Sequence, residues 1–230
     1  MILHLVTDRR RLSGATADPG RARQCLLRQA RHAFDARIDV LQIREPDLEA
    51  TELARLVTGM VAMARGSRSR IVVNDRLDIA LACGAAGVHL RANSLPPLAA
   101  RSIAPRGFVI GRSVHTLEEA AAVASDVDYL IAGTVWPSES KPGGAAGPPL
   151  LGLSGLAAIA ASVSVPVLAI GGVTLGRIAG VASSGAAGVA AIGLFMGFPG
   201  GQGGSPCRAM ALHETAEAAR ARFDTSRASS

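Results

Sequence analysis

The sequence predicts a single-domain (β/α)₈ barrel, an α/β fold, and three observations lead to this fold class. Eight short apolar or β-branched runs alternate with Ala-, Leu- and Arg-rich amphipathic stretches along the chain. The chain has 230 residues, of which 49% are hydrophobic, close to the ~250 residues typical of this barrel. No G-x-G-x-x-G motif follows the first run, which argues against an open dinucleotide-binding sheet.

Each run is expected to be a parallel strand, because a helical stretch separates it from the next run and can cover the sheet. Pro19 precedes the first long helical stretch, and Thr116 with Glu119 forms a capping box at the start of another. We expect the barrel to occupy residues 1–224 and residues 225–230 to form a disordered tail. The predicted strands are residues 3–7, 40–44, 71–74, 87–90, 108–111, 129–132, 167–170 and 188–192.

Composition narrows the classes of function. No apolar run approaches the ~20 residues of a membrane span, and no basic segment precedes the first apolar run as in a signal peptide. We therefore expect a cytoplasmic protein without a membrane partner. The net charge of +6 comes mostly from scattered arginines, and only 3% of residues are aromatic, which argues against a nucleic-acid partner. Three widely spaced cysteines predict neither a disulfide framework nor a zinc site.

Polar residues follow the second and third predicted strands. In this fold, catalytic groups lie at the C-terminal strand ends, and alternation points Gln42 and Arg44 together into the barrel mouth. A guanidinium there needs an anion, which could be a ligand or a structural ion pair with Glu45 or Asp75. Asn74 and Asp75 could cap the next helix, contact a ligand, or do both.

The fifth and sixth strand ends carry further candidates. Ser113 and His115 are expected to share a face, and a histidine before a helix N-terminus can exchange a proton near neutral pH; a structural histidine is the alternative. The long loop after the sixth strand contains Ser138, Ser140 and Lys141, the only lysine of the chain. Hydroxyls, an ammonium and flexible backbone are typical of an anion cradle, although such a loop can also be disordered.

Glycines at the last two strand ends give the most specific signal. Gly171 and Gly172 follow the seventh strand, while Ile192 and Gly193 end the eighth. Helix N-termini at these positions form the recurrent phosphate site of the (β/α)₈ barrel. Ordinary turn formation after a strand is the alternative.

Taken together, these segments resemble the thiamine phosphate synthase/TenI family. The resemblance runs in order through nearly the whole chain and leaves only the tail and the preceding Gly-rich loop unmatched. The matching segments are LHLVTD (3–8), VLQIRE (40–45), VNDRLDIA (73–80), GVHL (87–90), IGRSVHTLEEAA (110–121), DYL (128–130), the loop 133–141 and IGGV (170–173).

The resemblance implies substrates and roles. The synthase joins a pyrimidine methyl pyrophosphate to a thiazole phosphate, uses Mg²⁺ held by acidic residues, and releases pyrophosphate. By resemblance, three groups of residues would serve three ligands. The pyrimidine pyrophosphate and its metal would contact Gln42, Arg44, Asn74 and Asp75. The pyrophosphate would also contact Ser113, Ser138, Ser140 and Lys141. The thiazole phosphate would bind the backbone amides of Gly171, Gly172, Ile192 and Gly193.

Two departures favour the TenI branch. The synthase usually has a lysine where Pro46 stands, and an aspartate, the second metal ligand, where Ser94 stands. TenI proteins lack the complete metal set, and the resemblance then implies a thiazole tautomerase, an isomerase with His115 as acid/base and no cofactor. The alternatives are a synthase with Mg²⁺ on Asp75, or a non-catalytic phosphate-binding barrel. A homo-oligomer is also expected by resemblance.

Overall fold

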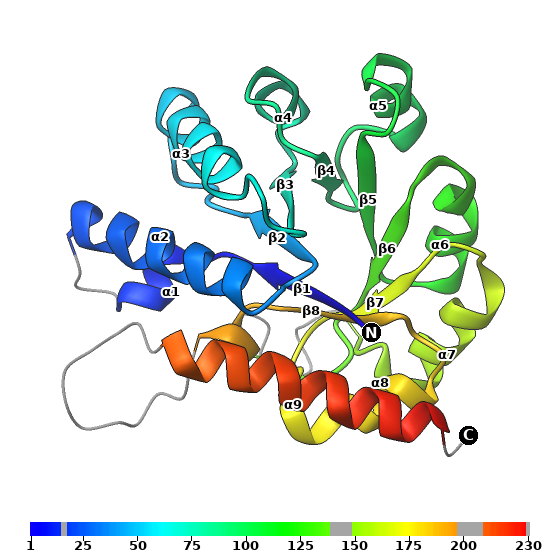
Figure 1. Cartoon of the computed structure of the whole chain (residues 1–230). Helices are drawn as coiled ribbons and strands as arrows, with labels where there is room; N and C mark the ends of the chain where they lie inside the picture. The colour runs from blue at the N-terminus through cyan, green and yellow to red at the C-terminus, as the bar shows by residue number, and fades with distance from the viewer. Residues whose placement is uncertain (15–17, 139–148, 197–208, 229–230) are drawn as a thin grey trace.

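Eight parallel strands close into a barrel in chain order, β1 to β8, with helices around them (Figure 1). This is a computed structural model, and it describes residues 1–14, 18–138, 149–196 and 209–228. The closed parallel barrel confirms the predicted fold class. No helix in the described ranges is long and apolar enough to span a membrane.

The strands lie close to the predicted runs. The largest difference is at β5, which continues three residues beyond the predicted end and so includes Ser113. The strands are β1 (Ile2–Val6), β2 (Val40–Ile43), β3 (Arg70–Asn74), β4 (Gly87–Leu90), β5 (Val109–Val114), β6 (Tyr129–Ala132), β7 (Val167–Ala169) and β8 (Gly188–Ala191).

The α-helices surround the barrel, and short 3₁₀ helices follow some of the strands and helices. The α-helices are α1 (Arg9–Ser13), α2 (Pro19–Asp35), α3 (Ala50–Met63), α4 (Leu77–Ala82), α5 (Pro97–Ile103), α6 (Leu117–Val123), α7 (Gly152–Ser162), α8 (Ile178–Ser183) and α9 (Ala209–Ala228). The 3₁₀ helices are η1 (Ala124–Asp126), η2 (Leu175–Arg177) and η3 (Gly193–Phe195).

Helix starts follow the local sequence signals. Pro19 opens α2, and the Asp18 side chain accepts a hydrogen bond from a backbone amide of the first turn. At α6, Thr116 Oγ1 accepts from the Glu119 amide (3.2 Å), while the Glu119 carboxylate accepts from the amide of His115 (2.7 Å). Thr116 thus caps the helix as predicted, whereas the reciprocal bond of Glu119 goes to the residue before the cap instead of to Thr116 itself; both bonds fix the backbone just after β5.

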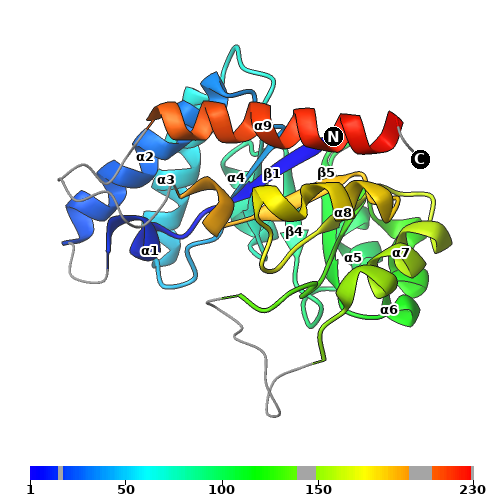
Figure 2. The ribbon, with the colours of Figure 1, turned by 90° about the horizontal axis from the view of Figure 1, so that it is seen from below.

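Helix α9 reaches further than expected, because it includes residues 225–228 of the predicted tail. Thr225 Oγ1 donates to the Ala221 carbonyl (2.8 Å), and the Arg227 guanidinium lies 5.7 Å over the ring of Phe223. Phe223 is fully buried, so this end of the helix is anchored by packing. In Figure 2, α9 crosses the molecule beside α2 and α8, and it packs against both.

The molecule has two apolar regions. The larger lies between the outer faces of the strands and the helices and includes Leu3, Leu26 and Leu130. The smaller fills the inside of the barrel with Val6, Tyr129, Ile131, Leu168 and Ala190. Because side chains fill the barrel, a ligand can bind only above them, at the C-terminal strand ends.

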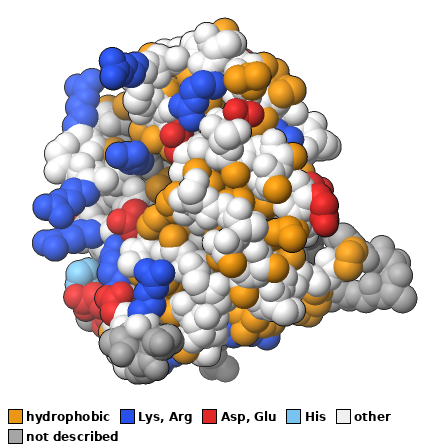
Figure 3. Space-filling model, turned by 90° about the vertical axis from the view of Figure 1, so that its right-hand side faces the viewer, with side chains coloured by type: hydrophobic (Ala, Val, Ile, Leu, Met, Phe, Trp, Pro, Cys, Tyr) orange, Lys and Arg blue, Asp and Glu red, His pale blue; other side chains and the backbone are white. Residues whose placement is uncertain are grey.

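Large exposed hydrophobic side chains lie on neighbouring helices of the outer ring. Leu98 and Ile103 on α5 are 66% and 63% exposed, and Leu117 on α6 is 40% exposed. Figure 3 shows this side of the molecule, where hydrophobic side chains are interspersed with polar and backbone atoms. Scattered apolar residues are normal on a protein surface, so the homo-oligomer stays a prediction.

Candidate active site

A chain of buried hydrogen bonds crosses the barrel interior beneath the mouth. His4 Nε2 and Gln42 Oε1 are 2.9 Å apart, and Gln42 Nε2 donates to Asn74 Oδ1 (2.8 Å). An amide oxygen can only accept, so His4 carries its proton on Nε2. Its Nδ1 is buried and has no partner among the described residues. Since Asn74 Oδ1 already accepts, its NH₂ group is the part of the amide that can donate to a ligand.

A second buried group lies next to the first. Asn74 is opposite His89 across the β3–β4 pair, and the ring centroids of His4 and Tyr129 are 5.6 Å apart. His89 Nδ1 is 3.1 Å from Tyr129 Oη, and His89 Nε2 is 2.8 Å from Ser113 Oγ. Burial lowers the pKa of His4 to about 4 and that of His89 well below its ordinary value. Burial also raises the pKa of Tyr129. All three side chains are therefore neutral at pH 7, and a neutral polar lining suits a heteroaromatic ring better than a charged group.

Sequence reasoning missed His4, His89 and Tyr129 as residues of the barrel interior. The signal was present, because His4 lies between Leu3 and Leu5, which pack in the outer core. With strict alternation, a residue between two outward-facing leucines points into the barrel. The short strand GVHL carries the same information for His89.

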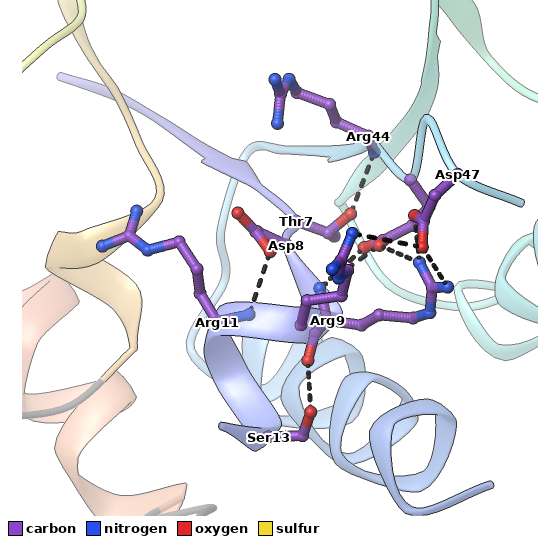
Figure 4. A network of polar contacts seen from close by, with 9 residues as sticks. Thr7, Asp8, Arg9, Arg11, Ser13, Arg44 and Asp47 are labelled. Atoms are coloured by element: carbon purple, nitrogen blue, oxygen red, sulfur yellow. Dashed lines mark hydrogen bonds and ion pairs between the residues drawn. The ribbon is translucent and has the colours of Figure 1, made fainter. Parts of the chain in front are cut away.

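Arg44 follows β2 at the rim and is half-buried. Neither of the two ion pairs considered from the sequence is formed: Glu45 pairs with Arg9 (2.9 Å), and Asp75 pairs with Arg91 (2.5 Å). In Figure 4, Arg44 extends away from the ion pairs around Arg9. The Arg44 guanidinium thus has no carboxylate partner in the described part of the chain, and it can meet an anionic ligand.

Asp75 occupies an unusual position after β3. Its backbone has φ = +63° and its amide donates to the His89 carbonyl (2.9 Å). Left-handed backbone at a residue other than glycine is uncommon and clusters at functional sites. Oδ2 accepts from Arg91 Nε (2.7 Å), while Oδ1 is buried without a partner among the described residues. Helix capping does not explain Asp75, because Arg76 is the N-cap of α4 and no side chain caps it.

The loop after β4 is held by a second arginine. Arg112 on β5 donates to the carbonyls of Ala92 (2.6 Å) and Leu95 (2.9 Å), and burial lowers its pKa. Ser94 lies in this loop, at the position where the resemblance implies that a second metal-binding carboxylate has been lost. Across the described ranges, no group of three or more His, Cys, Asp or Glu residues could hold a metal. A cation at Asp75 would therefore depend on ligands from the substrate and from water.

His115 lies just past the end of β5 and is exposed, whereas Ser113 is half-buried within the strand. His115 Nδ1 hydrogen-bonds to the Gly133 carbonyl, a contact that requires the proton on Nδ1. Strand alternation ends at Val114, so it does not govern His115. The expected shared face is not seen: Ser113 contacts the barrel interior, and His115 stands on the rim.

Gly171 and Gly172 form a turn that only glycine fits. Their φ angles are +97° and +61°, in the region that L side chains rarely adopt. A Cβ atom on Gly172 would lie 2.8 Å from Trp136 Cβ and 3.0 Å from Arg177 Nη1. Arg177 also donates to the Gly172 carbonyl (2.5 Å) and stacks 5.0 Å over the Trp136 ring. The turn after β7 is therefore held in shape from two sides.

The turn after β8 lies beside the turn after β7. Ala169 pairs with Val189, so continuing both strands brings the Gly171–Gly172 turn next to Ile192. Ile192 is the N-cap of η3, and Gly193 is its first residue. The two turns expected to bind phosphate are thus neighbours, as a shared phosphate site requires.

The loop after β6 is described only in part. Ser138 is half-buried, close after Trp136 in the chain. Ser140 and Lys141 lie outside the described residues, so their contacts with an anion stay predictions.

The family model and the curated relatives point to one family. The family model for thiamine monophosphate synthase matches residues 13–195. A thiamine-phosphate synthase of Methanoculleus marisnigri is 37% identical over 220 residues, 95% of this chain and 97% of that protein. Another, of Methanoregula boonei, is 42% identical over 171 residues, 74% and 78% of the two chains. A solved thiamine phosphate pyrophosphorylase from Pyrococcus furiosus has a TM-score of 0.77 at 29% identity, covering 98% of this chain and 96% of that one.

These relatives correct the prediction of a thiazole tautomerase, an isomerase that uses His115 without a metal. Curated relatives that are 37–42% identical to this chain are named thiamine-phosphate synthases. The prediction gave too much weight to the carboxylate lost at Ser94. Mg²⁺ often binds through one or two carboxylates plus substrate phosphates, and Asp75 keeps a buried oxygen to which no described residue hydrogen-bonds. The chain belongs to the thiamine monophosphate synthase family.

Proposed function

We propose that this protein is a thiamine phosphate synthase, a transferase that joins hydroxymethylpyrimidine pyrophosphate to thiazole phosphate and releases pyrophosphate. The observation that carries the proposal is the buried Oδ1 of Asp75, which has no hydrogen-bond partner among the described residues and lies next to Asn74 at the end of β3. Arg44, without a carboxylate partner among the described residues, is a further anion-binding group at the same mouth. A pyrophosphate bound there would face cationic and metal-binding groups together.

The neutral polar interior suits the pyrimidine. The Asn74 NH₂ group can donate to a ring acceptor, because Gln42 and His4 fix the direction of its amide. His89 and Ser113, on the neighbouring strands β4 and β5, supply further neutral groups. The apolar residues below close the barrel, so the pyrophosphate end of this substrate would point outward to the rim.

The donor set fits a magnesium ion that arrives with its substrate. Asp75 Oδ1 is a hard oxygen ligand, and Mg²⁺ is commonly held by one or two carboxylates together with phosphate oxygens and water. When bound, Mg²⁺ would neutralise charge on the departing pyrophosphate. Arg44 would bind the same group through its guanidinium, and we assign Ser138, Ser140 and Lys141 to it by resemblance.

The thiazole phosphate would occupy the opposite side of the mouth. The glycine turns after β7 and β8 are adjacent, and glycine lets backbone amides approach a phosphate closely. The two substrates would then lie with their reacting ends across the barrel mouth. The main contribution of the protein is to orient them and to exclude water between them.

The test is direct. The purified protein should form thiamine phosphate, detected by chromatography, from both substrates with Mg²⁺, and Asp75→Asn should lower kcat/KM by about 10²-fold or more. Asp78→Asn is the matched control, because Asp78 is exposed and pairs with Arg76 on the same segment; it should change activity less than twofold. If both substrates bind but no thiamine phosphate forms, the chain is a phosphate-binding barrel without this activity.

A further inference from the structure

Helix α1 lies beside the turn after β8 because the barrel is closed. β1 pairs with β8, and Leu5 is opposite Ala191. The chain leaves β1 at Val6 and enters α1 at Arg9, so α1 borders the same rim as Gly193. Segments more than 180 residues apart in sequence, α1 from Arg9 and η3 from Gly193, therefore meet at the edge of the turns after β7 and β8.

On the side away from β8, helix α1 is anchored by contacts with the segment after β2. Arg9 Nη1 lies 2.9 Å from Glu45 Oε2, and both Nη atoms contact Asp47 at 2.7 and 2.8 Å. The Arg9 amide also donates to Glu45 (3.1 Å), and Asp8 accepts from the Arg11 amide (3.0 Å) at the helix start. The Arg9 side chain is only 11% exposed. These contacts fix both the position and the rotation of a short helix that could not hold itself alone.

That rotation directs Arg11 toward β8. Residues two apart on a helix differ by about 200° around its axis, so Arg11 projects from the side opposite Arg9. Figure 4 shows the Arg11 side chain extending away from the Arg9 contacts and toward the segment after β8. Its Nη2 atom lies 3.9 Å from the position that a Cβ atom on Gly193 would occupy. Arg10, between the two, has a side chain that is 73% exposed.

We propose that Arg11 is a phosphate-binding residue, whose guanidinium supplies positive charge to a phosphate monoester at the turns after β7 and β8. Backbone amides carry only partial charges, and a phosphate dianion is bound more strongly when a guanidinium adds charge-assisted hydrogen bonds. Arg177, on the far side of these turns, donates to the Gly172 carbonyl and so serves to hold the turn. Naming the phosphate of the thiazole substrate as the ligand rests on the proposed function.

The first experiment compares Arg11→Ala with Arg10→Ala, a matched loss of one neighbouring arginine. For Arg11→Ala, KM for thiazole phosphate should rise about tenfold, while KM for the pyrimidine pyrophosphate changes less than twofold. Arg11→Lys should recover part of the loss. With the thiazole alcohol, which lacks the phosphate, wild type and Arg11→Ala should perform alike. An equal rise in both KM values, or the same loss with the alcohol, would overturn the proposal.

A second experiment does not depend on synthase activity. Inorganic phosphate is titrated into the wild type and both variants, and the backbone amide signal of Gly193 is followed by NMR. We expect the dissociation constant to increase about tenfold in Arg11→Ala and to stay within twofold in Arg10→Ala. An unchanged constant in Arg11→Ala would refute the role of Arg11, even if the enzyme proves to be a synthase. If Arg11→Ala loses phosphate affinity as expected but the protein has no synthase activity, the phosphate-binding role of Arg11 is supported and the proposed function fails.

Discussion

The ion pair between Arg91 and Asp75 leads to a prediction about metal affinity. Arg91 occupies Oδ2 of Asp75 at 2.5 Å, so a Mg²⁺ ion about 2 Å from Oδ1 would lie roughly 5 Å from the guanidinium. Coulomb repulsion between charges of +1 and +2 at that distance is about 2 kcal/mol in water and about 7 kcal/mol at an effective dielectric constant of 20. The Arg91 side chain is 58% exposed, so the lower value applies. Arg91→Ala should therefore raise metal affinity by about tenfold.

The assay is a titration of the free protein with Mn²⁺, followed by EPR, together with the Mg²⁺ dependence of the synthase rate. Arg76→Ala is the control, because Arg76 forms a similar exposed ion pair with Asp78 (2.6 Å). Both variants should stay within about 1 kcal/mol of wild-type stability. Equal metal affinity in Arg91→Ala and wild type would show that the guanidinium does not compete with the ion. Weaker affinity in Arg91→Ala would show instead that Arg91 orients Asp75 for the metal.

Three further predictions concern the groups around the mouth. Burial lowers the pKa of His4 from 6.5 to about 4, so the contribution of the neutral ring to the free energy of unfolding is fully present above pH 6.5 and is lost as the pH falls toward 4. Over this range the free energy of unfolding in urea should fall by about 3 kcal/mol more in the wild type than in His4→Asn. The same pH dependence in both proteins would contradict this. Arg9→Met leaves the buried Glu45 carboxylate without its guanidinium and should lower the free energy of unfolding in urea by about 3–5 kcal/mol. Arg10→Met should lower it by under about 0.5 kcal/mol, and equal losses in the two variants would disprove the anchoring role of Arg9. Arg177→Met removes the hydrogen bond to the Gly172 carbonyl, so KM for thiazole phosphate should rise about tenfold with KM for the pyrimidine substrate unchanged, and a rise in both values would argue against a local effect.

The sequence was most informative where strand periodicity applies. Alternation correctly placed Gln42 in the barrel interior, and the same rule, applied to LHLV and GVHL, would have found His4 and His89. It stopped being useful one residue past a strand, at His115. Periodicity predicts the direction of a side chain only while the backbone stays extended, so it could not predict the directions of the side chains on the barrel rim.

Contacts between loops could not be predicted at all. Arg91 and Asp75 are 16 residues apart, and their contact depends on the left-handed backbone of Asp75 and on the loop that Arg112 holds in place. Likewise, Arg11 reaches Gly193 only because the barrel closes β1 against β8. Such pairs depend on tertiary geometry, and a single sequence contains no local pattern for them.

The mistaken choice of a tautomerase has a physical explanation. It treated the residues at Pro46 and Ser94 as separate requirements, so that each loss weakened the case for pyrophosphate chemistry. Electrostatic stabilisation depends instead on the summed field of the charges around the leaving group. Arg44 lacks a carboxylate partner among the described residues, and Arg91 places another guanidinium beside Asp75. If these arginines replace the missing charge, Arg91→Ala should bind the metal more tightly and yet raise KM for the pyrimidine pyrophosphate. A variant that gains metal affinity without any loss of pyrophosphate binding would show that Arg91 makes no such compensation.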